Sequence, residues 1–230
     1  MCMQELHQFH DTNGEIKAQK YPEQFDPKWV VMESGWPYFR LSALDNQPWK
    51  GMHSEAMNLI DSFHEHREEY GKGWRSLTLH GLDEDTQSLD SYGDRQESIK
   101  QLDWTWVADK CPETKKFLTD VWPAEYLNRV RFMLLEPGGY IAPHTDTLKH
   151  KLSPVNIALN HPKGCIMKMA GHGTVPFKDG EAYILDVGNT HAYYNKSNED
   201  RYHIIVHGNY KYNNKWKELI ENSYKKNGTN

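Results

Sequence analysis

Residues 140–146 read YIAPHTD, and residues 191–201 read HAYYNKSNEDR. The first stretch contains His144 and Asp146, and the second begins with His191 and ends with Arg201. Residues two apart on a β-strand point to the same face, so a strand here would place the imidazole of His144 beside the carboxylate of Asp146. We interpret His144, Asp146 and His191 as the ligands of one metal ion.

The hydrophobic pattern around these residues has a period of two, starting at Arg129. Short runs of this kind are separated by Gly, Pro and Asn turns, which is typical of an antiparallel sandwich or barrel. We expect a turn at Pro137-Gly138-Gly139. The predicted strands are Arg129–Leu135, Tyr140–Thr147, Val155–Leu159, Cys165–Ala170, Thr174–Phe177, Ala182–Leu185, His191–Asn195 and Tyr202–Tyr210. The predicted fold class is therefore mainly β with flanking helices.

The chain divides into three parts. Residues 129–210 form the predicted catalytic core, and residues 211–230 form a tail with a short exposed helix over 215–225. Residues 1–128 are predicted to pack on the barrel as an α/β flanking region, not as an independent domain. Within that region we expect strands at Trp29–Met32, Trp36–Leu41 and Trp74–His80, helices over 54–70 and after Pro112, and a polar loop over 83–98. Whether that loop is a lid stays open.

Composition excludes several classes of partner. The 230-residue chain has a formal net charge of −5 and a pI near 6.2, with no long basic run, so nucleic acid and anionic membranes are not expected partners. No apolar run approaches the roughly 20 residues of a membrane span. The three cysteines are scattered, which favours a reducing compartment, and we predict a cytoplasmic protein.

The donor set decides which metal we expect. Two imidazoles and one carboxylate on one side of an ion leave the opposite side open, which is the pattern of non-haem Fe(II) oxygenases. A closed zinc site would need four ligands and would use cysteine. The His-x-Glu pairs at 53–55 and 66–68 fall in predicted helix, where such spacing does not chelate. The alternative, that His144 and His191 are ordinary polar residues at strand ends, stays open.

Arg201 opens a predicted strand on which His203, Ile205 and His207 share its face. Polar residues dominate this face, which suggests a lined cavity. An arginine fork suits a carboxylate because it offers two parallel charge-assisted hydrogen bonds. The alternative is a surface cation that pairs with Glu199 or Asp200.

These motifs resemble the 2-oxoglutarate/Fe(II) oxygenases, and more narrowly the aspartyl/asparaginyl β-hydroxylase family, which includes free-proline cis-hydroxylases. The segments that carry the resemblance are Arg131-Phe132-x-x-Leu135-x-Pro137-Gly138, Pro143-His144-Thr145-Asp146, Pro162-Lys163-Gly164-Cys165, Gly180-Glu181-x-x-x-Leu185-Asp186, His191-x-x-x-Asn195 and Arg201. The resemblance implies a double-stranded β-helix (jelly-roll, cupin-like) that binds Fe(II) through His144, Asp146 and His191. It also implies 2-oxoglutarate as co-substrate, with its 5-carboxylate on Arg201, and O₂ as oxidant.

The expected reaction is hydroxylation of an amino acid or a peptidyl Asp/Asn-type side chain. The animal peptidyl enzymes lack a carboxylate ligand where this chain has Asp146, which shifts the expectation toward free amino acids. A serine that helps those enzymes hold 2-oxoglutarate falls near Met133 here, so we predict His203 as the partner of Arg201.

Arg131 and Asn156 are the predicted substrate-binding residues, and Trp74 and Arg75 are further candidates at the mouth of the site. Strand alternation leaves open whether Arg131 or its neighbours point into the barrel. Two other functions remain as alternatives. One is a cupin-like binding or sensing module without turnover, and the other is a metal-dependent isomerase.

Overall fold

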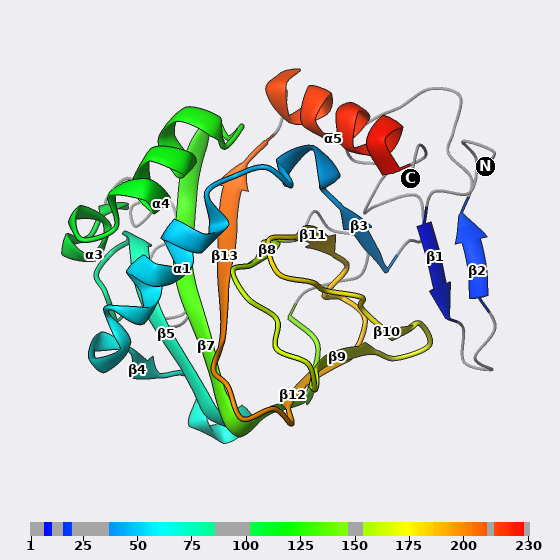
Figure 1. The fold of residues 1–230 in the computed structure, drawn as a ribbon, viewed down its shortest axis with the longest axis horizontal. Coiled ribbons are helices and arrows are strands. Elements are labelled where there is room, and N and C mark those ends of the chain that lie inside the picture. Colours follow the sequence, from blue (N-terminus) through cyan, green and yellow to red (C-terminus); the bar gives the residue numbers. More distant parts are fainter. Residues whose placement is uncertain are drawn as a thin grey trace.

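A computed structural model describes residues 7–10, 16–19, 37–85, 102–146, 154–210 and 214–227 of the chain (Figure 1). The described part is mainly β, and one sheet of 11 strands curls back on itself while helices cover one side (Figure 1). The predicted jelly-roll fold is confirmed. Among the described residues, no helix is long and apolar enough to cross a membrane.

The path through the large sheet runs β10-β9-β12-β7-β13-β8-β11-β3, with β5 on the other side of β7 and with β4 and β6 beside β5. The strands of this sheet are β3 (Tyr38–Arg40), β4 (His64–Glu65), β5 (Gly71–Gly81), β6 (Asp103–Trp104), β7 (Tyr126–His144), β8 (Val155–Ala158), β9 (Cys165–Met169), β10 (Gly173–Thr174), β11 (Ala182–Leu185), β12 (His191–Asn195) and β13 (Arg201–Asn209). A separate ribbon pairs β1 (His7–His10) with β2 (Ile16–Gln19).

Strand β7 organises the fold because it has different partners along its 19 residues. Its first half pairs with β13 and β5, and its last residues pair with β12. The predicted turn at residues 137–139 is therefore wrong, since the strand continues through it. Gly138 has a φ of 74°, and a Cβ at Gly139 would lie 2.8 Å from the Glu136 carbonyl oxygen, so glycines let the strand bend there without reversing.

Two hydrophobic cores lie on opposite faces of the sheet and bury alternate residues of its strands. Phe132 and Ile204 belong to the outer core, which the helices cover. Met133 and Leu135 belong to the inner core, inside the curl of the sheet. Since alternate residues on a strand point to opposite faces, buried apolar side chains on both faces explain the hydrophobic run from Phe132 to Leu135 in β7.

The helices are α1 (Trp49–Met57), α3 (Trp106–Asp109), α4 (Pro112–Lys116), which continues as a π-helical turn (Phe117–Val121), and α5 (Asn214–Asn227). Short 3₁₀ turns cover Ser42–Leu44, Ile60–Ser62 and Glu68–Tyr70. The predicted helix after Pro112 is confirmed. The helix predicted after residue 210 is present, but its Trp216 and Ile220 are buried, so it is packed and not exposed.

The prediction of a helix over 54–70 is wrong. The helix begins at Trp49 and ends at Met57, with Ser54 in its interior, and the chain is extended at Phe63. The next two residues form β4, which pairs with β5 through His64 and Ser76. Sheet pairing therefore overrides the helical spacing of the sequence here. The strand predicted at Trp29–Met32 and most of the loop predicted over 83–98 lie outside the described residues.

Candidate metal centre

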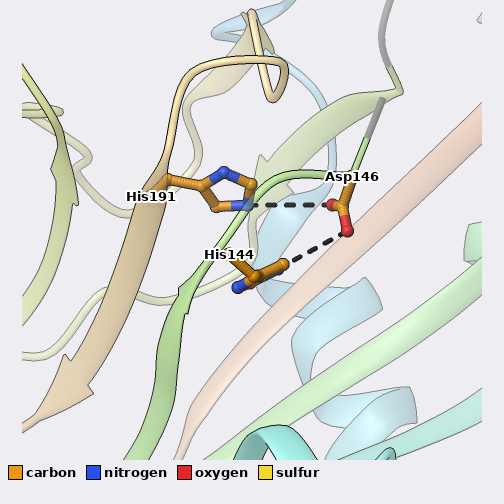
Figure 2. A group of neighbouring side chains, drawn as sticks. All are labelled: His144, Asp146 and His191. Carbon is orange, nitrogen blue, oxygen red and sulfur yellow. Dashed lines mark ion pairs between the residues drawn. The ribbon is translucent and has the colours of Figure 1, made fainter. Parts of the chain in front are cut away.

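The three predicted metal ligands converge (Figure 2). His144 ends β7 and lies opposite His191, the first residue of β12, in the register of the two strands. One donor atom from each of His144, Asp146 and His191 lies within 4.8 Å of the others. Among the residues that the structure describes, no other group of His, Cys, Asp and Glu is arranged this way.

The backbone fixes the tautomer of both imidazoles. His144 donates from Nδ1 to the carbonyl of Ala142 at 2.7 Å, and His191 donates from Nδ1 to the carbonyl of Asn189 at 3.0 Å. A carbonyl oxygen only accepts hydrogen bonds, so each Nδ1 carries the proton and each Nε2 keeps a lone pair. Burial lowers the pKa of His191, which keeps its ring neutral, as a metal ligand must be.

The donor atoms fit a divalent cation. The Nε2 atom of His144 lies 3.5 Å from one carboxylate oxygen of Asp146, and the Nε2 atom of His191 lies 3.7 Å from the other (Figure 2). Three electron-rich groups thus face one another with no hydrogen atom between the rings and the carboxylate. A cation between them converts this repulsion into coordination. The Asp146 side chain is 39% exposed, so the site stays open on that side.

Turns at both ends of the site position the ligands. The backbone N–H of Asp146 donates to the carbonyl of Val187. The turn before His191 is closed by Asp186, which accepts from Gly188 and whose carbonyl accepts from Asn189. Strand pairing and these turns therefore bring together residues from distant parts of the chain.

Arg201 is buried in the same cavity. Its exposed fraction is 2%, and it lines the cavity together with the three metal ligands. Its Nη2 donates to Nδ1 of His203 at 2.6 Å, and its guanidinium lies 4.8 Å from the centre of the Tyr193 ring. Its Nε has no hydrogen-bond partner, and no ion pair joins it to a carboxylate among the described residues. The alternative of a surface cation is therefore wrong.

Of the two predicted substrate-binding residues, Asn156 lines the cavity and Arg131 does not. Asn156 is buried and lines the cavity, as does Trp74. Arg131 pairs in register with Ile205, which pairs with Asn156, so all three point to the inner face. Arg131 itself lies outside the cavity lining, and its Nη1 lies 3.5 Å from Nε2 of His66.

Arg75 points away from the cavity, which includes its neighbour Trp74 but not Arg75. Its guanidinium donates to the carbonyl of Phe63 and to Glu136. Arg75 is therefore not a mouth residue.

Sequence reasoning missed Arg67. Its Nη1 lies 3.9 Å from the carboxylate of Asp146. Its φ is 50°, and it is the one non-glycine residue with positive φ in the described ranges. Strained backbone of this kind gathers at functional sites. Nothing in the sequence signals it, because Arg67 stands in a polar run that has the appearance of a solvated helix end.

Sequence reasoning also missed His161. Its Nδ1 lies 3.4 Å from Nε2 of His203, which in turn contacts Arg201. The sequence signal was its position just before the Pro162-Lys163-Gly164 turn, where the chain returns to the sheet.

Comparison with known proteins places the chain. The family model for aspartyl/asparaginyl β-hydroxylases matches residues 46–209, more than half of the 230 residues. No curated protein matches the sequence.

Similar solved structures include a Pseudomonas putida prolyl-4-hydroxylase (13% identity, TM-score 0.44, covering 80% of this chain and 99% of that one). Another is SnoN, a non-haem α-ketoglutarate-dependent epimerase from nogalamycin biosynthesis (14% identity, TM-score 0.48, covering 74% of this chain and 76% of that one). A third is a Trichoplax adhaerens prolyl hydroxylase (12% identity, TM-score 0.43, covering 76% of this chain and 84% of that one). These likenesses are too distant to bear on the reaction or the substrate. By the family match, the chain belongs to the aspartyl/asparaginyl β-hydroxylase family of 2-oxoglutarate- and Fe(II)-dependent oxygenases.

Proposed function

We propose that this oxygenase hydroxylates an amino acid or a peptidyl Asp/Asn-type side chain and couples that reaction to decarboxylation of 2-oxoglutarate. The observation that carries the proposal is the convergence of His144, Asp146 and His191 beside a buried arginine, Arg201, in one cavity. A metal site alone is common to many folds, but an adjacent buried guanidinium suits a co-substrate with a second carboxylate.

His144, Asp146 and His191 would hold the iron. When bound, Fe(II) and 2-oxoglutarate would supply the chemistry that uses O₂ to hydroxylate an unactivated C–H bond. The protein orients the two imidazoles through the carbonyls of Ala142 and Asn189, and burial of His191 lowers the pKa of that ring. It also presents three protein ligands on one side, which leaves the other side for small molecules.

Arg201 would bind the 5-carboxylate of 2-oxoglutarate. A buried guanidinium without a carboxylate partner is costly, and an incoming carboxylate would remove that cost. The Tyr193 ring below the guanidinium and His203 beside it hold the fork in place. His203 therefore acts on the co-substrate through Arg201.

Asn156 and Arg131 would recognise the substrate. Asn156 lines the cavity and carries both a donor and an acceptor. Arg131 lies one strand beyond Ile205 on the same inner face, where a substrate carboxylate entering past Asn156 would meet it. Trp74 would supply an apolar wall beside His144, since the two rings lie 6.3 Å apart.

The test is a substrate screen with purified protein, Fe(II) and 2-oxoglutarate, in which succinate is measured. Free amino acids are compared with peptides that contain Asp or Asn. We expect one class to raise succinate well above the substrate-free rate, with one hydroxylated product per succinate. Succinate that never exceeds the rate of a His191→Ala control would refute the proposal. Conversion without O₂ or 2-oxoglutarate would favour an isomerase.

A further inference from the structure

A chain of hydrogen bonds leads from Arg201 toward the protein surface. Arg201 donates to Nδ1 of His203 at 2.6 Å, and Nε2 of His203 lies 3.4 Å from Nδ1 of His161. Nε2 of His161 lies 3.1 Å from the carbonyl oxygen of Cys165. His203 is fully buried, whereas His161 is half-buried. The ring of Phe177 packs against both imidazoles, with centroids 4.9 Å from His203 and 5.4 Å from His161.

The two ends of this chain fix every proton in it. A guanidinium only donates, so Nδ1 of His203 must accept and its proton is on Nε2. The Cys165 carbonyl only accepts, so His161 carries its proton on Nε2 and its Nδ1 accepts from His203. Both imidazoles are therefore neutral and each makes two hydrogen bonds. Burial and the nearby charge of Arg201 lower the pKa of both rings, which agrees with this assignment.

Carboxylates contact several other arginines of the described residues, whereas Arg131, like Arg201, contacts an imidazole, that of His66 at 3.5 Å. Arg40 contacts Asp45 at 2.8 Å and Glu181 at 3.0 Å, and Arg75 contacts Glu136 at 3.4 Å. In those places a carboxylate cancels the charge of the guanidinium. At Arg201 the same orienting contact comes from an imidazole, which leaves the positive charge intact.

We propose that His203 and His161 are a positioning pair that fixes the fork of Arg201 while leaving its charge available to a ligand carboxylate. The proposal rests on the proposed role of Arg201 in binding 2-oxoglutarate. His161 matters because its Nδ1 accepts the Nε2 proton of His203, the tautomer that the donation from Arg201 requires. Without that acceptor, the buried Nε2–H of His203 would lose its partner, and the tautomer with its lone pair toward Arg201 would become costly.

The decisive variant is His203→Asp. It replaces a neutral acceptor with a carboxylate that pairs with Arg201 inside the protein. We expect affinity for 2-oxoglutarate to fall by more than 100-fold, while the melting temperature without 2-oxoglutarate stays equal or rises because a buried charge gains a partner. If His203 had only a structural role, the Asp variant would lose stability together with its affinity for 2-oxoglutarate.

Two further variants refine the test. His203→Asn keeps an acceptor near the place of Nδ1, so we expect it to recover most of the affinity. His161→Phe keeps a flat ring at a half-buried position but removes the acceptor, and we expect affinity to fall about 10-fold, as for loss of one hydrogen bond to a charged network. His64→Gln, at an exposed histidine, is the control and should match the native protein.

Binding is measured by titrating 2-oxoglutarate into the anaerobic Fe(II) protein and following visible charge-transfer absorption, and stability by thermal unfolding without ligand. His203→Asp that binds within threefold of native overturns the proposal, as does unchanged binding by His161→Phe. If His203→Asp does not fold, His161→Phe decides. A native protein that binds no 2-oxoglutarate overturns the proposed function and this inference with it, whereas native binding with unaffected variants overturns this inference alone.

Discussion

At the scale of single residues, the metal centre depends on local contacts that set the direction of each imidazole. His144 and His191 each bond through Nδ1 to a carbonyl two residues earlier in the chain. Such contacts fix both ring orientation and tautomer, and they raise the basicity of the ligating nitrogen. The ligand atoms are therefore ready for a metal before one arrives.

We expect His191→Ala to abolish turnover and to lower affinity for Mn(II), used as a stable substitute for Fe(II), by about 100-fold or more. The reason is that only His144 and Asp146 would remain as ligands. Calorimetric titration of Mn(II) and a succinate assay check the two effects. His64→Ala is a matched control, because His64 is exposed and lies outside the cluster. Retained activity would contradict the ligand assignment.

Arg201→Ala should raise the concentration of 2-oxoglutarate needed for half-maximal turnover by orders of magnitude. A buried, paired charge contributes about 2–5 kcal/mol when one partner is removed. Arg201→Lys should fall between the native protein and the alanine variant, since it keeps the charge but loses the two-pronged fork. An unchanged requirement in the alanine variant would exclude Arg201 as the anchor.

The metal ligands and Arg201 could be predicted from the sequence, because their spacing along the chain indicates their roles. His144 and Asp146 stand two apart in a period-two segment, and Arg201 opens the strand that follows His191. The sequence did not predict the direction of Arg131, because alternation defines two faces without saying which one is inside. His161 and Arg67 were missed because their roles arise from contacts with residues far away in the chain.

At the scale of elements, glycines where β5 meets β7 control the approach of the two strands. A Cβ at Gly71 would meet the carbonyl oxygen of Tyr140, and backbone cannot move aside cheaply. A Cβ at Gly138 would meet nothing within 4 Å, so there the only cost is the positive φ of 74°.

We therefore expect Gly71→Ala to destabilise the protein by several times the roughly 1–2 kcal/mol expected for Gly138→Ala. It should also weaken Mn(II) binding, because Gly71 pairs with Ile141 just before the metal ligands. Urea unfolding and Mn(II) titration of the two variants check this. Equal stabilities would show that the strands can shift apart without loss.

Some strands were predictable for a physical reason. The side chains of β8 and β9 are mostly buried and these strands begin directly after Pro154 and Gly164, so their pattern and their starts are written locally, whereas the boundary predicted at residues 137–139 is wrong because β7 continues through it. The segment 54–70 carries helical spacing at Ala56, Leu59, Ile60 and Phe63, but β4 forms within it. Pairing with β5 decides that outcome, and pairing partners are not visible in a single segment.

At the scale of the whole molecule, several histidines are buried in neutral form. Burial and the guanidiniums of Arg131, Arg67 and Arg129 lower the pKa of His66 to about 2. Burial and Arg201 lower the pKa of His161 to about 4 and that of His203 well below its usual value. In the unfolded chain each would titrate near 6.5.

Below pH 6.5 the unfolded chain therefore takes up protons that the folded protein does not, and stability falls as the solution becomes more acidic. Each such histidine contributes a slope of up to about 1.4 kcal/mol per pH unit between pH 6.5 and its folded pKa. Urea unfolding at pH 7, 6 and 5 measures the slope. His66→Gln should make it shallower, whatever the stability of that variant at pH 7. An identical slope would contradict the neutral state of His66.

Strand β7 pairs with β5 on one side and with β13 and β12 on the other, so it joins both parts of the curled sheet. Separating the strands beside β7 to admit a substrate would break the backbone hydrogen bonds on both sides of one continuous 19-residue strand. Reactants must instead pass through the rim, where Asp146 is the exposed ligand. Changes of substrate specificity are then expected at this open end of the site and not in the paired strands, which position His144 and His191.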